Sequence, residues 1–285
     1  MTPATMQDDD VIEGVTLLGR LNTDDATVAA QVRHAIRQGH PQLRPMPPNP
    51  DRVALVCGGP SLNDTLDELI ELYFAGARVV TVNGAYHWCL THNIRPSAQI
   101  VLDARPSTPR FVEPARPRCI YFVASQCHAD VWASVADRPQ VEIFHAVASE
   151  DSQLKPILDD YYGDGRWVGI GGGTTVALRA IGLLRTLGYL RFDLFGFDSC
   201  FLGAAHHAFD QPENQRDRPS PVEVYPVGHP ELARTFHCAP WMLAQFEDFL
   251  KFVKHNGDQV LLNVHGDGLI AYALKSSAEL VVSPS

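Results

Sequence analysis

Short apolar runs alternate with longer stretches in which apolar residues recur every three or four positions, from Arg52 almost to the end of the chain. The short runs are rich in β-branched residues, which favour strands, whereas the longer stretches have the periodicity of amphipathic helices. The pattern predicts strands at 53–57, 78–82, 98–102, 118–123, 141–145, 191–196 and 259–264. It predicts helices at 61–76, 85–92, 128–136, 174–187 and 239–255. This alternation is typical of a mostly parallel sheet with helices on both faces, so we expect a Rossmann-like α/β fold.

A different kind of segment precedes this pattern. Capping residues at 22–25 introduce a short helical pattern. The stretch 40–50 then contains five prolines, which exclude a helix interior or a central strand. We therefore expect residues 1–50 to form an N-terminal helical arm with a proline-rich linker, and residues 51–285 to form one Rossmann-like domain.

Composition narrows the choice of partners. The formal net charge of −10 and the isoelectric point near 5.6 argue against a broad surface for nucleic acid or anionic membranes. The chain starts with acidic residues where a signal peptide is basic and then apolar, and no apolar run approaches a membrane span. Six cysteines without a C-x-x-C pair are typical of reduced, mostly buried thiols. We expect a cytoplasmic protein that binds small molecules, either as a monomer or as a homo-oligomer.

Ligands of such sheets bind beyond the carboxyl ends of the strands, and four of these ends carry residues suited to binding. Gly58-Gly59-Pro60-Ser61 follows the first strand, Asn83-Gly84 the second, Asp103 the third and Asp198 the sixth. A glycine turn before a helix lets the backbone approach an anion, which the helix N-terminus attracts, so the first turn is a candidate phosphate site. It matches neither a Walker loop nor the dinucleotide fingerprint. The alternatives are an ordinary connection for the glycines and turns or helix caps for Asn83 and the aspartates.

Two further segments are candidates for the site. Gly172, Gly173 and Thr174 open the predicted helix at 174–187 and offer a second anion site, with close helix packing as the alternative. His206 and His207 lie in a long loop predicted between Asp198 and about Pro240, which is long enough to act as a lid or an acceptor platform.

The alternatives for this loop involve further residues. Exposed polar histidines are one, and a metal centre of His206, His207, Asp210 and His237 is another. The second lacks the helical H-x-x-x-H spacing of zinc enzymes. Arg105 and Arg110, just past Asp103, are candidates for binding an anionic group of the substrate.

The order and spacing of several motifs extend over residues 52 to about 272. They are Val56–Leu62, Thr81–Ala85, Ile100–Asp103, Gly171–Ala177, Leu187–Asp198, His206-His207 and Leu262–Leu269. Together they resemble the MptE-like 6-hydroxymethylpterin diphosphokinase family, which includes the flagellar motility-associated factor glycosyltransferases. The chain departs from the family at Asn263-Val264-His265-Gly266, where members have asparagine, a small residue, threonine and a glycine-rich turn.

The resemblance implies a nucleotide-dependent transferase. Its first reading is pyrophosphoryl transfer from ATP to a hydroxymethyl acceptor, with release of AMP. The alternative is a glycosyltransferase that uses a CMP-activated nonulosonate-type sugar and releases CMP, and a second alternative is a nucleotide-binding module without catalysis. Residues 51–285 are then a nucleotide-binding transferase domain.

The same resemblance implies roles for the candidate residues. Asp103 and Asp198 are expected to hold Mg²⁺ or the acceptor hydroxyl, and His206 and His207 to assist proton transfer or the departing phosphate. The nucleotide is expected to contact Gly58, Gly59, Pro60, Ser61, Asn83, Gly84, Gly172, Gly173 and Thr174.

Overall fold

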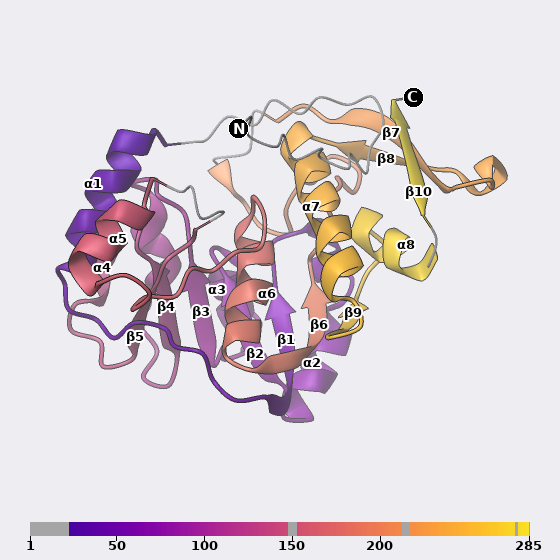
Figure 1. Cartoon of the computed structure of the whole chain (residues 1–285). Helices are drawn as coiled ribbons and strands as arrows, with labels where there is room; N and C mark the ends of the chain where they lie inside the picture. The colour runs from indigo at the N-terminus through magenta and orange to yellow at the C-terminus, as the bar shows by residue number, and fades with distance from the viewer. Residues whose placement is uncertain (1–22, 148–152, 213–216, 277–278, 285) are drawn as a thin grey trace, which may run out of the picture.

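The structure, a computed structural model, describes residues 23–147, 153–212, 217–276 and 279–284. A seven-stranded parallel sheet with the order β5-β4-β3-β2-β1-β6-β9 forms its centre (Figure 1). The strands are β1 (Asn49–Val56), β2 (Arg78–Val82), β3 (Ala98–Val101), β4 (Ile120–Ala124), β5 (Val141–Phe144), β6 (Tyr189–Phe195) and β9 (Leu261–Val264). All seven correspond to predicted strands, which confirms the α/β fold class.

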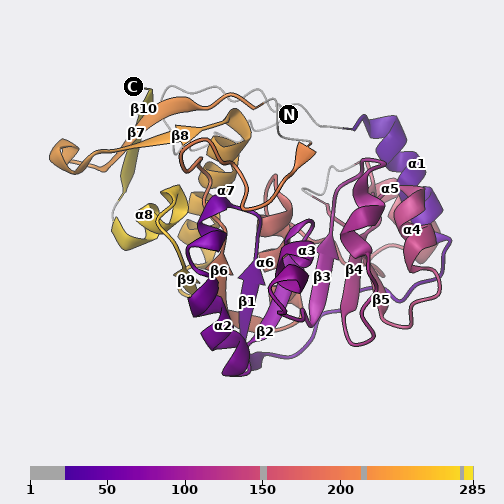
Figure 2. The ribbon, with the colours of Figure 1, turned by 180° about the vertical axis from the view of Figure 1, so that it is seen from behind.

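Helices cover both faces of this sheet. α2 (Leu66–Phe74) and α3 (Ala85–Thr91) lie on one face, which Figure 2 shows, and α6 (Val176–Thr186) and α7 (Pro240–Asn256) lie on the other, in front of the sheet in Figure 1. A smaller apolar cluster packs under α2 and α3, and a larger one fills the opposite side. No helix of the described residues is long and apolar enough to cross a membrane.

The predicted N-terminal helix is present as α1 (Asp25–Ile36) and is integrated into the main core. Asp24 caps it by accepting a hydrogen bond from the Thr27 N–H at 2.9 Å. The helix packs against α4 (Ala129–Val135) and α5 (Lys155–Tyr162), and Val32 is fully buried. The proline-rich segment that follows runs alongside the sheet, where Leu43 N–H donates to the Ile143 carbonyl at 2.9 Å. The division at residue 50 stays a prediction, and residues 1–22 lie outside the described part.

A second, antiparallel sheet was not predicted. It has the order β10-β7-β8 and consists of β7 (Ser220–Pro226), β8 (Arg234–Cys238) and β10 (Leu280–Pro284). The prediction of one long loop from Asp198 to Pro240 is therefore wrong for its second half. Prolines at both ends of β7, with exposed Glu223 between buried valines, hide the strand in the sequence. α5 and α8 (Leu269–Ser276) were also missed.

All six cysteines are buried and unbridged, as expected. Burial raises the pKa of every one of these thiols. They are therefore protonated, unreactive core residues at neutral pH.

Two glycines with similar backbone conformations test how closely the proline-rich segment packs against the start of β6. Gly188 (φ +85°) connects α6 to β6, and a Cβ there would collide with the Pro47 carbonyl group, whereas Gly76 (φ +89°) has no atom within 4 Å of such a Cβ. We expect Gly76→Ala to lower the free energy of unfolding by about 1–2 kcal/mol through backbone strain alone. Gly188→Ala should cost about 1–3 kcal/mol more, because the collision adds to the strain. Urea denaturation measures both, and equal losses would contradict the close approach.

Candidate functional site

The predicted turns meet at one edge because the strands are parallel and in register. Val56 at the end of β1 pairs with Thr81 of β2 on one side and Phe195 of β6 on the other. The chain proceeds from β1 outward to β5 and then returns to the opposite side of β1, so the boundary between β1 and β6 is the topological switch point of the sheet. Ligands of open α/β sheets bind at this position.

The Gly58–Ser61 turn is joined to Asp198 across this boundary. Ser61 donates its backbone N–H to Asp198 Oδ2 at 2.9 Å and its hydroxyl to Oδ1 at 2.6 Å, and Gly59 N–H donates to the Gly196 carbonyl at 2.7 Å. Asp198 is 3% exposed, and Gly59 lies so close that any side chain there would collide with its carboxylate. These amide groups point into the protein, so the structure fixes the turn tightly, and the phosphate site at this turn stays a prediction.

The environment of Asp198 favours its protonated form. Burial raises the pKa of this carboxyl to about 6, although the two hydrogen bonds from Ser61 act in the opposite direction. Gly266 and Gly268 pack against Ser61 and Asp198 from the segment after β9, and their lack of side chains makes this possible. Asp198 is therefore the point at which three loops of the edge are joined.

The loop that follows Asp198 and carries His206 and His207, called the histidine loop below, packs directly on the Gly58–Ser61 turn. Ala208 N–H donates to the Gly58 carbonyl at 3.0 Å, and a Cβ on Gly58 would come within 2.7 Å of the His207 ring. The Nδ1 atoms of His206 and His207 are 2.6 Å apart, which requires one ring to donate and the other to accept. The structure thus brings this imidazole pair next to Gly58, where the sequence could place it only in a long loop.

Asn83 and Gly84 reach the same place from β2. Asn83 adopts a left-handed backbone conformation (φ +43°), and its side-chain oxygen is buried without a hydrogen-bond partner among the described residues. Gly84 packs under the ring of Phe209, so that a Cβ there would lie 2.5 Å from the ring. Asn83 is thus close to the histidine loop and retains an unused acceptor.

Asp103 is held by a neighbouring cation. Arg105 Nε donates to both carboxylate oxygens at 2.9 Å, and the Arg105 backbone N–H donates to Oδ1 at 2.9 Å. The Asp103 side chain is 9% exposed. Arg105 is consequently engaged by Asp103, and the guanidinium of Arg110 lies over the ring of Phe111.

The two predicted metal ligands do not fit a resident Mg²⁺ in this arrangement. The ion needs carboxylate oxygens that face water or substrate phosphates, whereas Asp198 is turned to Ser61 and Asp103 to Arg105. No group of three or more His, Cys, Asp or Glu side chains in the described part of the chain is placed to hold a metal, and this also applies to the histidine loop. The Mg²⁺ prediction stays a prediction that this geometry does not favour.

The second glycine turn is occupied by the chain itself. Thr174 N–H donates to Asp248 Oδ2 at 2.8 Å, and Gly173 lies against the same carboxylate. From α6, Arg179 donates to the carbonyls of Gly173 at 2.9 Å and Ile170 at 2.5 Å. An anion at Thr174 would have to displace Asp248, so the anion site predicted with Gly172 also stays a prediction.

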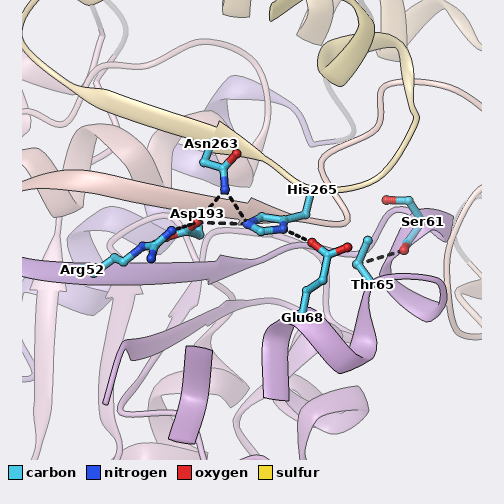
Figure 3. Close-up of polar contacts among 7 residues, drawn as sticks. All are labelled: Arg52, Ser61, Thr65, Glu68, Asp193, Asn263 and His265. Atoms are coloured by element: carbon cyan, nitrogen blue, oxygen red, sulfur yellow. Dashed lines mark hydrogen bonds and ion pairs between the residues drawn. The ribbon is translucent and has the colours of Figure 1, made fainter. Parts of the chain in front are cut away.

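A charged cluster next to this edge was missed by the sequence analysis (Figure 3). His265 joins Asp193 of β6, through Nε2 at 3.0 Å, to Glu68 of α2, through Nδ1. Asp193 is 1% exposed and also accepts hydrogen bonds from Arg52 Nη2 at 2.7 Å and Asn263 Nδ2 at 3.0 Å. The departure from the family pattern at residues 263–266 therefore supplies a link between β6, β9 and α2.

The pKa shifts in this cluster follow from its partners. Burial alone would raise the pKa of Asp193, but His265, Arg52 and Asn263 lower it to about 2. Burial alone would likewise lower the pKa of His265, but the carboxylates of Asp193 and Glu68 raise it above its ordinary value. A signal for the cluster was available, because Asp193 is a charged residue between the apolar residues Phe192 and Leu194 of a predicted strand.

Other polar residues at the edge were missed as well. Ser125 and Gln126 follow β4, His145 follows β5, and Thr175 precedes α6. Each has a buried side-chain atom that lacks a hydrogen-bond partner among the described residues. A hollow of about 580 Å³, by contrast, lies at the opposite edge between the amino ends of β1, β6 and β9, and it contains none of the predicted site residues.

Asp198 should make stability depend on pH in a defined direction. Its pKa in the folded protein, about 6, exceeds the ordinary value of 3.8, so the folded state binds the extra proton between these values. Stability from this group therefore falls as pH rises from 4 to 6 and is constant above that range. Relative to wild type, Asp198→Asn should gain about 3 kcal/mol in unfolding free energy between pH 4 and pH 7. Urea titrations at several pH values measure this, and a constant difference would contradict it.

His265 should act in the opposite half of the pH scale. Because its pKa is raised in the folded state, the stabilisation is complete below the ordinary value of 6.5 and is lost as pH rises through the folded pKa. We expect His265→Gln to lower the unfolding free energy by about 1–3 kcal/mol at pH 6 and by less at pH 9. His229→Gln, on an exposed side chain, is the control and should show no such convergence. A gap of the same size at both pH values would argue against a charged His265.

Comparisons with known proteins agree with this architecture. A model of the family described as 6-hydroxymethylpterin diphosphokinase MptE-like matches residues 31–204. No curated protein matches the chain. Among solved structures, the MAf glycosyltransferase from Magnetospirillum magneticum AMB-1 aligns with a TM-score of 0.57 and 14% identity, over 93% of this chain and 40% of that protein. A mammalian sialyltransferase in complex with Gal-beta-1-3GalNAc-ortho-nitrophenol aligns with a TM-score of 0.44 and 11% identity, over 84% of this chain and 79% of that protein.

The weight of these comparisons differs. The likeness to the MAf glycosyltransferase shows a shared fold, and the present chain spans less than half of that protein's length. At its lower TM-score the sialyltransferase likeness carries no further argument. The family match covers well over half of the chain and indicates a transferase. The protein thus belongs to the MptE-like family, and its predicted motifs lie on the fold shared with the MAf glycosyltransferase.

Proposed function

We propose that this transferase moves a sugar from a nucleoside-monophosphate donor, a CMP-activated nonulosonate-type sugar, to a hydroxyl acceptor at the carboxyl edge of the main sheet. The observation that carries the proposal is the position of the His206–His207 pair against Gly58 at the switch point. An imidazole beside a turn without side chains is suited to a single departing phosphate. It supplies a hydrogen-bond donor and a proton without any metal.

The proposed reaction breaks the bond between the anomeric carbon and the phosphate oxygen of the donor. The acceptor oxygen forms the new bond to that carbon and releases its proton to solvent water, and the CMP phosphate leaves with the electron pair of the broken bond. His207 would donate a hydrogen bond to the departing oxygen, with His206 holding the orientation of the ring through the Nδ1 contact. Such positioned proton transfer contributes about 10²–10⁴-fold to rate.

The two aspartates support this choice over phosphoryl transfer. Pyrophosphoryl transfer from ATP concentrates charge on bridging phosphate oxygens and usually relies on Mg²⁺ held by carboxylates. In this chain Asp198 organises the loops through Ser61, and Asp103 is neutralised by Arg105. We propose that both are positioning residues, and that Asn83 binds the nucleoside through its unpaired oxygen.

Pyrophosphoryl transfer from ATP to a hydroxymethyl acceptor is the second candidate. The match to the 6-hydroxymethylpterin diphosphokinase MptE-like model over residues 31–204 favours it. It would require Mg²⁺ to enter with the nucleotide, and Asp103 or Asp198 to exchange its present partner for the metal.

Donor preference can be measured without knowing the acceptor. We expect CMP to raise the melting temperature equally in EDTA and in Mg²⁺, because ligands of the folded state stabilise it. We also expect the protein to release CMP from CMP-N-acetylneuraminate. His207→Phe, which keeps a ring against Trp241, should lower that release about 100-fold with little change in CMP affinity. His229→Phe on the exposed hairpin is the matched control.

Other results would select other functions. A melting shift by ATP that needs Mg²⁺, with AMP release in the presence of 6-hydroxymethylpterin, supports the diphosphokinase. A shift by nucleotides with no release of either product leaves a nucleotide-binding module. No shift with any nucleotide rejects both transferase proposals.

A further inference from the structure

Unpaired polar atoms are concentrated at one part of this molecule. Eight buried side-chain nitrogen or oxygen atoms of the described residues have no hydrogen-bond partner. Six of them follow the carboxyl ends of strands or begin α6, and they belong to Asn83, Ser125, Gln126, His145 and Thr175. Because buried polar atoms are nearly always paired, such a concentration at one edge calls for an explanation.

The interior elsewhere satisfies similar groups. Gln99 of β3 is fully buried, and its amide donates to the carbonyls of Asn83 at 2.8 Å and Phe111 at 2.9 Å, while its oxygen accepts from Thr81 at 2.6 Å. Ser61 at 1% exposure uses both its N–H and its hydroxyl. Six of the eight unpaired atoms therefore lie at the edge, and the other two, in Gln31 and Trp132, lie on α1 and α4.

The outer half of the edge holds three of these residues close together. Ala124 and Phe144 are register partners at the ends of β4 and β5, so the turn that starts with Ser125 and Gln126 leaves the sheet next to His145, which follows β5. Ser125 N–H donates to the Phe144 carbonyl at 2.8 Å, which fixes this arrangement. Adjacent strands are about 4.8 Å apart, so the three side chains span the width of one sugar ring.

A wall next to this group comes from the segment that leads into α6. Ile170 N–H donates to the His145 carbonyl at 2.8 Å, and Thr175 follows five residues later with an unpaired hydroxyl. Arg179 holds this segment through the carbonyls of Val147, Ile170 and Gly173. The rings of Tyr162 and Trp167 pack around His145 at centroid distances of 5.4 and 6.1 Å.

The side chains of Ser125, Gln126, His145 and Thr175 carry no charge at neutral pH. They comprise two hydroxyls, one amide and one imidazole, and burial lowers the pKa of His145 to about 4, so that its ring is neutral at pH 7. The guanidinium of Arg179 donates to backbone carbonyls, and that of Arg105 donates to Asp103. A ligand with several hydroxyl groups and no net charge would match hydroxyl, amide and imidazole partners.

We propose that Ser125, Gln126 and His145 form an acceptor subsite for a neutral polyhydroxyl group, such as a sugar ring. The inference rests on the proposed function, since it divides the same edge into a donor half at β1, β2 and β6 and an acceptor half at β4 and β5. The subsite lies three strands from Gly58, about 14 Å away, which leaves room for donor and acceptor together.

Substitutions in the proposed subsite should weaken glycoside binding without lowering the melting temperature. Ser125→Ala removes a hydroxyl without a partner, so we expect an unchanged or higher melting temperature, together with at least about tenfold weaker binding of neutral methyl glycosides. Gln126→Leu should behave alike. Ser97→Ala, at the opposite end of β3, removes a hydroxyl that donates to the Val79 carbonyl at 2.9 Å, and it should lower the melting temperature and leave glycoside binding intact.

Methyl galactoside and methyl glucoside, titrated by NMR in the presence of CMP, are the probes. Glycoside binding that is lost in Ser125→Ala while the CMP-induced melting shift persists supports the subsite. Equal glycoside binding by the wild type, Ser125→Ala and Gln126→Leu overturns the subsite, and so does a wild-type protein that binds no glycoside. A fall in melting temperature in Ser125→Ala as large as that in Ser97→Ala also overturns it. A missing CMP shift alongside wild-type glycoside binding that depends on Ser125 rejects the donor assignment instead and keeps the subsite.

Discussion

The contact between Asp198 and Ser61 is the constraint on which the carboxyl edge depends. It joins the loops after β1 and β6, which are adjacent in the sheet but 137 positions apart in sequence. The segment after β9 packs on the same two residues through Gly266 and Gly268. The histidine loop continues from Asp198 and returns to the Gly58 carbonyl, so its position is determined from both sides. Both oxygens of the Asp198 carboxylate accept hydrogen bonds from Ser61, which limits the rise of its pKa on burial to about 6.

The three aspartates of this region bear on how an acidic chain could bind the anionic donor proposed above. Asp193 is ionised and compensated by Arg52 and His265, and Asp103 is compensated by Arg105. Burial raises the pKa of Asp198 to about 6, and the two hydrogen bonds from Ser61 offset part of the cost of its ionised form. The carboxylates near the switch point therefore project little uncompensated negative charge toward a phosphate, although the whole chain carries a formal charge of −10.

The sequence predicted the main sheet because its strands are buried on both faces and read as continuous apolar runs, of which Val53–Val56 is the clearest. It missed β7 because prolines bound that strand and its alternation is short. The candidate residues Asn83, Asp103 and Asp198 were chosen because each lies one to three residues past the end of a strand, and the structure places all three at the carboxyl edge of the sheet. His265 and Arg52 could not be predicted as partners of Asp193, since only the register of β1, β6 and β9 brings them together. Ser125 and Gln126 did carry a signal, because two polar residues follow a predicted strand, but only the lack of partners distinguishes them from an ordinary turn.

Paired and unpaired groups thus divide the edge into two regions with different physical roles. Around β1 and β6 no buried side-chain donor or acceptor of the described residues lacks a partner, and the bonds of Asp193 and Asp198 suit that region to holding the proposed leaving group in one orientation. Around β4 and β5 the polar atoms lack partners, and such groups lower stability unless something binds them. Packing alone does not explain why the fold keeps these destabilising unpaired atoms next to a region whose buried polar side chains are paired. Binding of a polar substrate is the reason that also explains why the unpaired atoms follow successive strands of one sheet edge.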